Sequence, residues 1–253
     1  MFLRRINFAC LACTFLACLF VPSVHAAYSS LSELHISNLQ ISAPSGSLIW
    51  TYGPSLNIAS ASIFDEPSGW VQSYDDDPGA SGQASASATA VYGANSAFAS
   101  ANQGKIDVVS TISNPTNAFV SLTDLAFGEI YNLFAVNGND PVQATFSLDW
   151  TAQLSGQTTT DTFALVYALQ LLVSDGINNH SREAYSILPI KGTQQSFNNA
   201  GSFYLDVLLQ PNTAYSLDVF GQVDPAQYVP EPSSLSLFLV AAALVRKFSR
   251  SKR

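Results

Sequence analysis

Basic residues are scarce along most of this 253-residue chain. Between residues 27 and 229 only Lys105, Arg182 and Lys191 are basic, against 17 acidic residues, so this stretch carries a net charge of −14. Such a deficit disfavours binding to nucleic acids or anionic lipid surfaces, while it keeps a chain soluble and attracts divalent cations. The chain is nevertheless 47% hydrophobic and only 11% charged, which excludes a charge-rich disordered protein.

Cysteine is confined to the first 18 residues, at Cys10, Cys13 and Cys18. The remainder of the chain therefore cannot form a disulfide, a cysteine-ligated metal site or a thiol nucleophile. A domain of about 200 residues does not need such crosslinks, because it buries roughly 70% of its unfolded surface. We expect its stability to come from a hydrophobic core.

Catalytic motifs are also missing. No Gly-x-Ser-x-Gly elbow, phosphate-binding loop, dinucleotide fingerprint or zinc-ligand spacing occurs. Glu33 and His35 would share one face of a strand, but the sequence shows no third partner for them. Asp175, His180 and Ser181 fall in one predicted loop and resemble a catalytic triad only in composition. We therefore predict no enzyme and no catalytic residues.

The N-terminus has the pattern of a secretory signal peptide over residues 1–26. Arg4 and Arg5 precede an apolar stretch at 6–21, which is shorter than the roughly 20 residues that span a bilayer. Small residues before the junction favour cleavage between Ala26 and Ala27. The predicted partners are the Sec translocon and signal peptidase.

The C-terminus, residues 229–253, combines three signals. A Pro230-Glu231-Pro232 motif precedes a short apolar segment at 235–245, and a basic tail follows. A basic cluster beyond an apolar helix stays on the cytoplasmic side of a membrane. The tail is formed by Arg246, Lys247, Arg250, Lys252 and Arg253.

This tripartite tail resembles the PEP-CTERM sorting signal of Gram-negative bacteria, and the resemblance covers only about the last 25 residues. It implies recognition and processing by an exosortase, a membrane-embedded protease, in cells that produce exopolysaccharide. It also implies transient attachment to the inner membrane, followed by delivery to the cell surface or the medium. The alternative is an ordinary tail anchor, but 11 residues rise only about 16 Å along a helix.

Residues 27–228 have the alternation typical of a single all-β domain. Apolar residues recur at every second position over 146–154, 163–173, 203–209 and 215–219. Turn residues between such runs predict an antiparallel sandwich or jelly roll of eight or more strands. Pro211-Asn212-Thr213 favours a hairpin between the last two runs. The one helix candidate is 124–133, which Gly128 weakens.

The run 82–101 alternates alanine with serine or threonine. Period two favours an extended strand whose small side chains allow a second sheet or another chain to approach closely. The alternative is a flexible low-complexity loop.

Two groups of residues are candidates for ligand binding. Asp75, Asp76 and Asp77 offer the hard oxygen ligands that Ca²⁺ prefers, or else form a solvated acidic turn. No other cofactor is expected. Four aromatic residues in Gly-, Pro- and Ser-rich surroundings suit stacking on sugar rings, or else fill the core. They are Trp50, Tyr52, Trp70 and Tyr74.

The sequence thus favours an exported, non-enzymatic protein of the cell surface or extracellular matrix that is associated with exopolysaccharide. One alternative is a carbohydrate-binding module, assisted by calcium or not. Another is a secreted polysaccharide-degrading enzyme.

Overall fold

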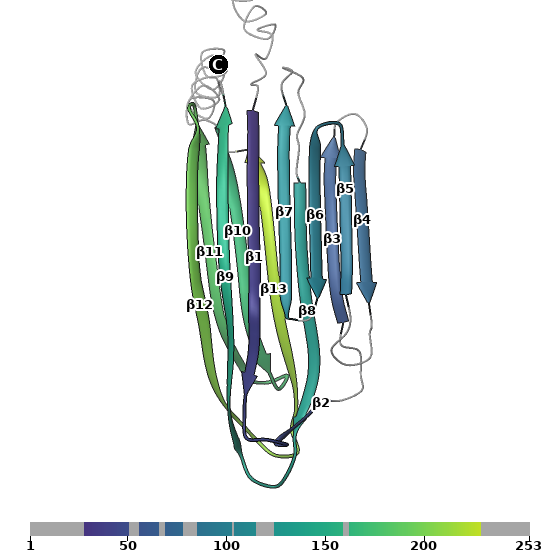
Figure 1. Cartoon of the computed structure of the whole chain (residues 1–253), viewed down its shortest axis with the longest axis vertical. Helices are drawn as coiled ribbons and strands as arrows, with labels where there is room; N and C mark the ends of the chain where they lie inside the picture. The colour runs from purple at the N-terminus through teal and green to yellow at the C-terminus, as the bar shows by residue number, and fades with distance from the viewer. Residues whose placement is uncertain are drawn as a thin grey trace, which may run out of the picture.

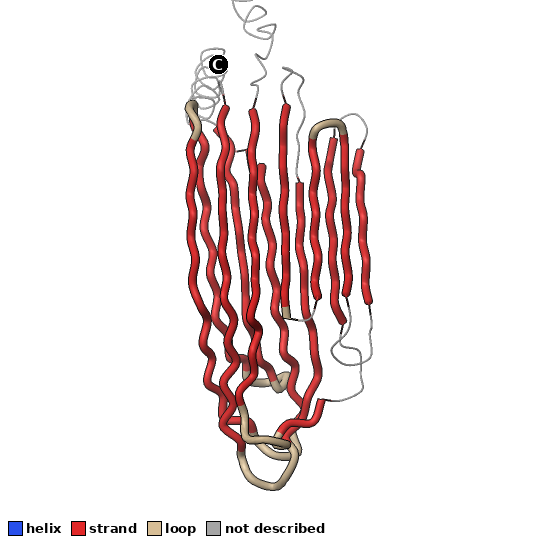
Figure 2. The backbone as a smooth tube through the Cα atoms, in the orientation of Figure 1, coloured by secondary structure: helices blue, strands red, loops and turns tan. Residues whose placement is uncertain are grey.

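The computed structural model describes residues 28–50, 56–65, 69–77, 85–102, 104–114, 124–158 and 162–228. The predicted signal peptide with its Ala26–Ala27 junction, and the predicted sorting segment from 229, lie outside these ranges. The described residues form thirteen β-strands and no helix, in two antiparallel sheets packed as a sandwich (Figures 1 and 2). The predicted all-β sandwich is confirmed. Among the described residues, no helix has the length and apolar character needed to cross a membrane.

The first sheet has six strands in the order β12-β9-β1-β7-β6-β5. Each strand runs antiparallel to its neighbours, and β1 and β9 form its long centre (Figure 1). Its strands are β1 (Tyr28–Ser42), β5 (Ser85–Tyr92), β6 (Asn95–Asn102), β7 (Lys105–Asn114), β9 (Val142–Thr158) and β12 (Gln195–Leu209).

The second sheet has seven strands, six of them in the order β11-β10-β13-β8-β3-β4, while the short β2 pairs with the end of β8. Its strands are β2 (Leu48–Trp50), β3 (Leu56–Asp65), β4 (Gly69–Asp77), β8 (Asp124–Val136), β10 (Thr162–Ser174), β11 (Asn179–Lys191) and β13 (Ala214–Tyr228).

Two local predictions were wrong. The helix candidate at 124–133 lies in strand β8, where Ala126, Gly128 and Ile130 point into the sandwich, so period two describes the segment better than a helical period. The strands on either side of Pro211-Asn212-Thr213 exist, but they do not form a hairpin. β12 pairs with β9 in one sheet and β13 pairs with β8 and β10 in the other, so this turn crosses between sheets.

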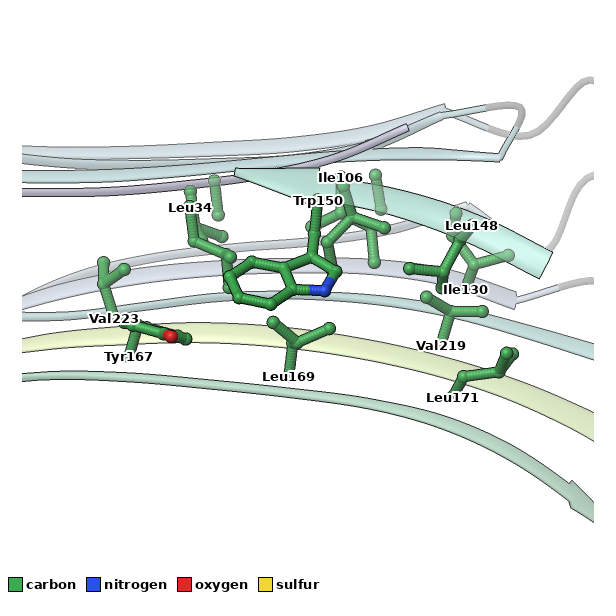
Figure 3. Close-up of a cluster of buried hydrophobic side chains, with 14 of the residues drawn as sticks. Leu34, Ile106, Ile130, Leu148, Trp150, Tyr167, Leu169, Leu171, Val219 and Val223 are labelled. Carbon is green, nitrogen blue, oxygen red and sulfur yellow. The ribbon is translucent and has the colours of Figure 1, made fainter. Parts of the chain in front are cut away.

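The core is thick on one side of the sandwich. Trp150 of β9 lies between the sheets, with its ring centroid 5.8 Å from that of Tyr167 on β10 (Figure 3). Its indole also covers Gly201, where an added Cβ would lie 3.0 Å from the ring atoms. Large side chains thus fill the space between β9 and β10.

The opposite side of the sandwich is thin. The described part of the alternating run, residues 85–101, lies in a hairpin of β5 and β6, and its buried inward residues are six alanines and Asn95. Cα atoms of β5 and β6 come within 8 Å of those of β3, closer than the usual sheet spacing of about 10 Å. The prediction of extended structure with close approach of a second sheet is confirmed. The inward alanines are Ala86, Ala88, Ala90, Ala97, Ala99 and Ala101.

Candidate functional site

A polar hollow lies on the outer face of the six-stranded sheet. Two rows of residues cross strands β1, β9 and β12 there, because directly paired residues share a face. His35 pairs with Thr151, and Glu33 pairs with Gln153. Their partners on β12 are Ala200 and Asn198. The hollow has a volume of about 400 Å³ and is lined by Glu33, His35, Thr151, Ala152, Gln153, Asn198, Asn199 and Ala200.

Hydrogen bonds hold His35 in place in the lining of this hollow. Its Nδ1 lies 2.8 Å from Oδ1 of Asp107 on β7, and Nζ of Lys105 lies 2.7 Å from the other oxygen. Burial alone would raise the pKa of Asp107, but the hydrogen bonds from Lys105 and His35, with the charge of Lys105, lower that pKa below its usual range. An ionised Asp107 accepts a hydrogen bond from the N–H at Nδ1 of His35. Nε2 is therefore the ring nitrogen that can hydrogen-bond to a ligand.

Sequence reasoning paired Glu33 with His35 but missed Asp107, which lies 72 positions away from His35. The two residues meet because β1 and β7 are antiparallel neighbours with His35 opposite Asp107. Thr151, Gln153 and Asn198 were missed as well, since isolated hydroxyl and amide side chains on strands carry no motif.

No family model, no curated protein and no solved structure matches this chain.

Asp175, His180 and Ser181 do not come together, and the prediction that they share one loop is wrong. His180 and Ser181 lie on strand β11, where successive residues point to opposite faces. Asp175 instead closes its own turn, accepting hydrogen bonds from the backbone N–H groups of Ile177 (2.8 Å) and Asn178 (2.6 Å). Hydrogen bonds from Asn178 are the main reason that the pKa of Asp175 falls to about 2. In the described part of the chain, no hydrogen bond joins Asp175, His180 and Ser181.

The predicted sugar-stacking residues separate into two places. Trp70 and Tyr74 lie on the outer face of β4, where they are 54% and 60% exposed. Four residues of strand place them about 13 Å apart. Trp50, on β2, packs instead against the buried Phe134 with ring centroids 5.2 Å apart. Tyr52 lies outside the described residues.

The three aspartates of β4 do not converge on one point. Asp77 accepts a hydrogen bond from the backbone N–H of Ser85 (2.9 Å), and Asp75 accepts one from that of Ser87 (2.8 Å). Both donors lie on β5, the edge strand of the other sheet. Asp76 lies on the opposite face of β4 and is exposed. Among the described residues, no group of three acidic, histidine or cysteine side chains could hold a metal ion.

The carboxylates of Asp75 and Asp77 bind backbone N–H groups at the exposed edge of the six-stranded sheet. An edge strand presents backbone groups that can pair with another chain. Asp75 and Asp77 occupy two of these N–H groups from the opposite sheet. On the other side, Nε of Arg182 on β11 donates to the carbonyl oxygen of Tyr204 on β12 (3.2 Å). Each side of the sandwich is thus fastened by side chains that cross from one sheet to the other.

Proposed function

We propose that this chain is an exported, non-enzymatic protein of the cell surface or extracellular matrix that associates with exopolysaccharide through the hollow on its six-stranded sheet. The observation that carries the proposal is the lining of that hollow. Carboxylate, imidazole, hydroxyl and amide groups from three adjacent strands all face one open depression. Sugar hydroxyls donate and accept hydrogen bonds, so a surface of this kind suits a polyhydroxylated chain.

The scaffold supports binding without a large ordering penalty. The side chains stand on paired strands, and Asp107 fixes the orientation of His35. Groups that are already positioned lose little conformational entropy when a ligand binds. The hollow is open, which suits a polymer that enters and leaves along the sheet.

Charge favours neutral glycans over acidic ones. The chain between residues 27 and 229 carries −14, and Glu33 lies in the hollow. An anionic polysaccharide would be repelled at low ionic strength. The absence of a catalytic motif in the sequence and the separation of Asp175 from His180 support binding rather than hydrolysis.

The proposed route to the surface rests on the two terminal signals. A signal peptide over 1–26 directs export, and the segment 229–253 resembles the tail that an exosortase processes. The polysaccharide-binding domain between them is then left outside the cell.

Native affinity electrophoresis tests the binding. The purified protein runs through gels containing dextran, a neutral polysaccharide, or alginate, an anionic one. We expect retardation by dextran and a roughly five- to tenfold loss of affinity in Gln153→Ala or Asn198→Ala, since one lost hydrogen bond is worth about 1–1.5 kcal/mol. Asn139→Ala, which changes an exposed asparagine in the turn between β8 and β9, is the matched control. Equal mobility in every gel would remove the proposal.

A second candidate function is sugar stacking on β4, which the exposure of Trp70 and Tyr74 on one face favours. Aromatic rings about 13 Å apart can contact separate residues of one glycan chain. An oligosaccharide that binds there would change the fluorescence of Trp70. The response should disappear in Trp70→Phe and persist in Trp50→Phe. No response at any oligosaccharide concentration would exclude this second surface.

A further inference from the structure

The outer face of the seven-stranded sheet differs from the polar face opposite. Phe127 of β8 and Phe220 of β13 lie on it with ring centroids 6.0 Å apart. At its margins, Tyr185 on β11 is 61% exposed and Trp70 on β4 is 54% exposed. Strand pairing places further large apolar side chains on the same face, namely Leu56, Ile58, Tyr74, Leu125, Tyr131, Leu133 and Leu172.

Two carboxyl groups lie within this apolar surface. Asp218 of β13 pairs with Tyr131, and Glu129 lies on the next row, opposite Phe220. Oδ1 of Asp218 is buried and has no hydrogen-bond partner among the residues that the structure describes. Burial and the nearby charge of Glu129 raise the pKa of Asp218 to about 6. Burial also raises the pKa of Glu129.

Within the described part of the chain, none of the remaining charged and titratable groups on this face lies next to these two carboxyls. Glu183 on β11 accepts a hydrogen bond from Gln170 of β10 (2.7 Å), and Asp76 lies on β4. Asp224 of β13 and Lys191, the last residue of β11, lie toward the far end of the sheet, away from Asp218. The other titratable groups there are the phenols of Tyr74, Tyr131 and Tyr185. Arg182 and His180 alternate onto the opposite face of β11.

We propose that this face binds a second copy of the chain when its carboxyl groups are protonated, giving a two-fold symmetric dimer in mildly acidic medium. The centre of the interface is formed by Phe127, Glu129, Asp218 and Phe220, and its margins by Tyr185 and Tyr74. This dimer is independent of polysaccharide binding at the hollow, which lies on the other sheet, but it would cover Tyr74 of the second candidate surface.

The size of the face matches what a stable dimer needs. Six strands at about 4.8 Å span about 29 Å, and nine residues from Leu125 to Leu133 span about 30 Å. The resulting area of about 850 Å² equals the roughly 800 Å² that each partner contributes to a standard interface. Two-fold symmetry brings the same patch of both copies together, so its apolar rows are self-complementary.

The ionisation of Asp218 and Glu129 determines whether a second copy can bind. At neutral pH the two copies would bring four carboxylates together at the centre of an apolar interface, which is strongly unfavourable. Protonation removes this repulsion and turns each carboxyl into a hydrogen-bond donor, which can pair with Oδ1 of Asp218 in the other copy. A second copy is therefore excluded at neutral pH and accepted in acid.

Sedimentation velocity of the purified protein tests this proposal. We expect a monomer at pH 7.5 and a dimer at pH 5.0, with at least tenfold tighter association at the lower pH. The double variant Asp218→Asn/Glu129→Gln should form the dimer at both pH values, because its side chains are neutral. Asp206→Asn, which changes an exposed aspartate on the other sheet, should behave as the wild type.

Tyr185→Arg places a charge in the proposed interface and should abolish the dimer at pH 5.0. Its matched control is Tyr204→Arg, because Tyr204 is 63% exposed on the six-stranded sheet and Tyr185 is 61% exposed on the other. Circular dichroism confirms that each variant is folded. A wild-type monomer at pH 5.0, equal association at both pH values, or no effect of Tyr185→Arg would overturn the proposal. A dextran-dependent change in Trp70 fluorescence without self-association would assign the face to a glycan instead.

Discussion

Replacing Gly128 with alanine tests the close approach of the two sheets. An added Cβ at this position would lie 2.6 Å from Cγ2 of Ile106 and 3.3 Å from the carbonyl oxygen of Ser100. Both neighbours belong to the opposite sheet, and Ile106 is fully buried. Overpacking of this kind costs about 1–3 kcal/mol. For a domain of this size, 2 kcal/mol lowers the melting temperature by about 4–8 °C.

Whether Gly128→Ala lowers or raises the stability of the fold distinguishes this close packing from ordinary sheet spacing. If the sheets were about 10 Å apart here, the new methyl group would fit, and Gly128→Ala would stabilise the fold by about 0.4–1 kcal/mol through the unfolded chain. Thermal and urea unfolding, followed by circular dichroism, measure the difference. An increase in stability would refute the claim that the two sheets approach closely at Gly128.

A double-mutant cycle supplies the control. Ile106→Ala removes Cγ2 and destabilises the core by about 2–5 kcal/mol. In the double variant the methyl group added at position 128 occupies part of the space that the isoleucine side chain vacates. The loss of stability in the double variant should therefore be smaller than the sum of the losses in the two single variants, by at least about 1 kcal/mol. Strict additivity would mean that the two side chains do not meet.

Three further predictions concern carboxyl groups. The folded-state pKa of Asp218, about 6, exceeds its ordinary value of 3.8, so the stability contributed by its proton is present below about pH 4 and lost as the pH rises through 6. Asp218→Asn should therefore raise the melting temperature at pH 7.5 and flatten the pH dependence of unfolding between 4 and 6; an unchanged slope would contradict this. The contribution of Asp175 to stability depends on pH in the opposite direction, because the pKa of Asp175 falls to about 2. Its contribution is present above about pH 4 and lost as the pH falls through 2, so Asp175→Ala should lower the melting temperature at pH 7 but not at pH 2. Finally, Asp75→Ala/Asp77→Ala removes two hydrogen bonds to the edge of β5. It should destabilise the fold by roughly 1–3 kcal/mol and increase aggregation measured by light scattering; Asp76→Ala, on the other face of the strand, should do neither.

The alternation of apolar and polar residues sufficed to predict an all-β sandwich, because each strand buries one face. It also indicated that the alternating run is extended, whereas only the structure shows that its alanines point inward and its serines outward. Alternation does not say which strand is the neighbour. The turn at 211–213 is short enough for a hairpin, yet β12 and β13 each complete a different sheet. Their pairing depends on β8, β9 and β10, which precede them in the chain.

The hollow could not be predicted for the same reason. Glu33 and His35 are two positions apart on one strand, so their common face follows from local geometry. Asp107, Gln153 and Asn198 join them only through the register of β7, β9 and β12. The aspartate triplet was visible in the sequence as a charge cluster. Only the placement of β4 against β5 shows that two of its carboxylates cap the edge of a sheet.

The most direct test of the central claim measures where the protein is found and in what form. Producing cells are fractionated, the matrix polysaccharide is digested enzymatically, and the intact mass of the released protein is determined. The account predicts a core that begins near Ala27, ends near Pro230 and is released with the polysaccharide. A chain that still carries 235–253 and remains in the inner membrane would contradict it, as would a processed core that stays in the medium without the polysaccharide.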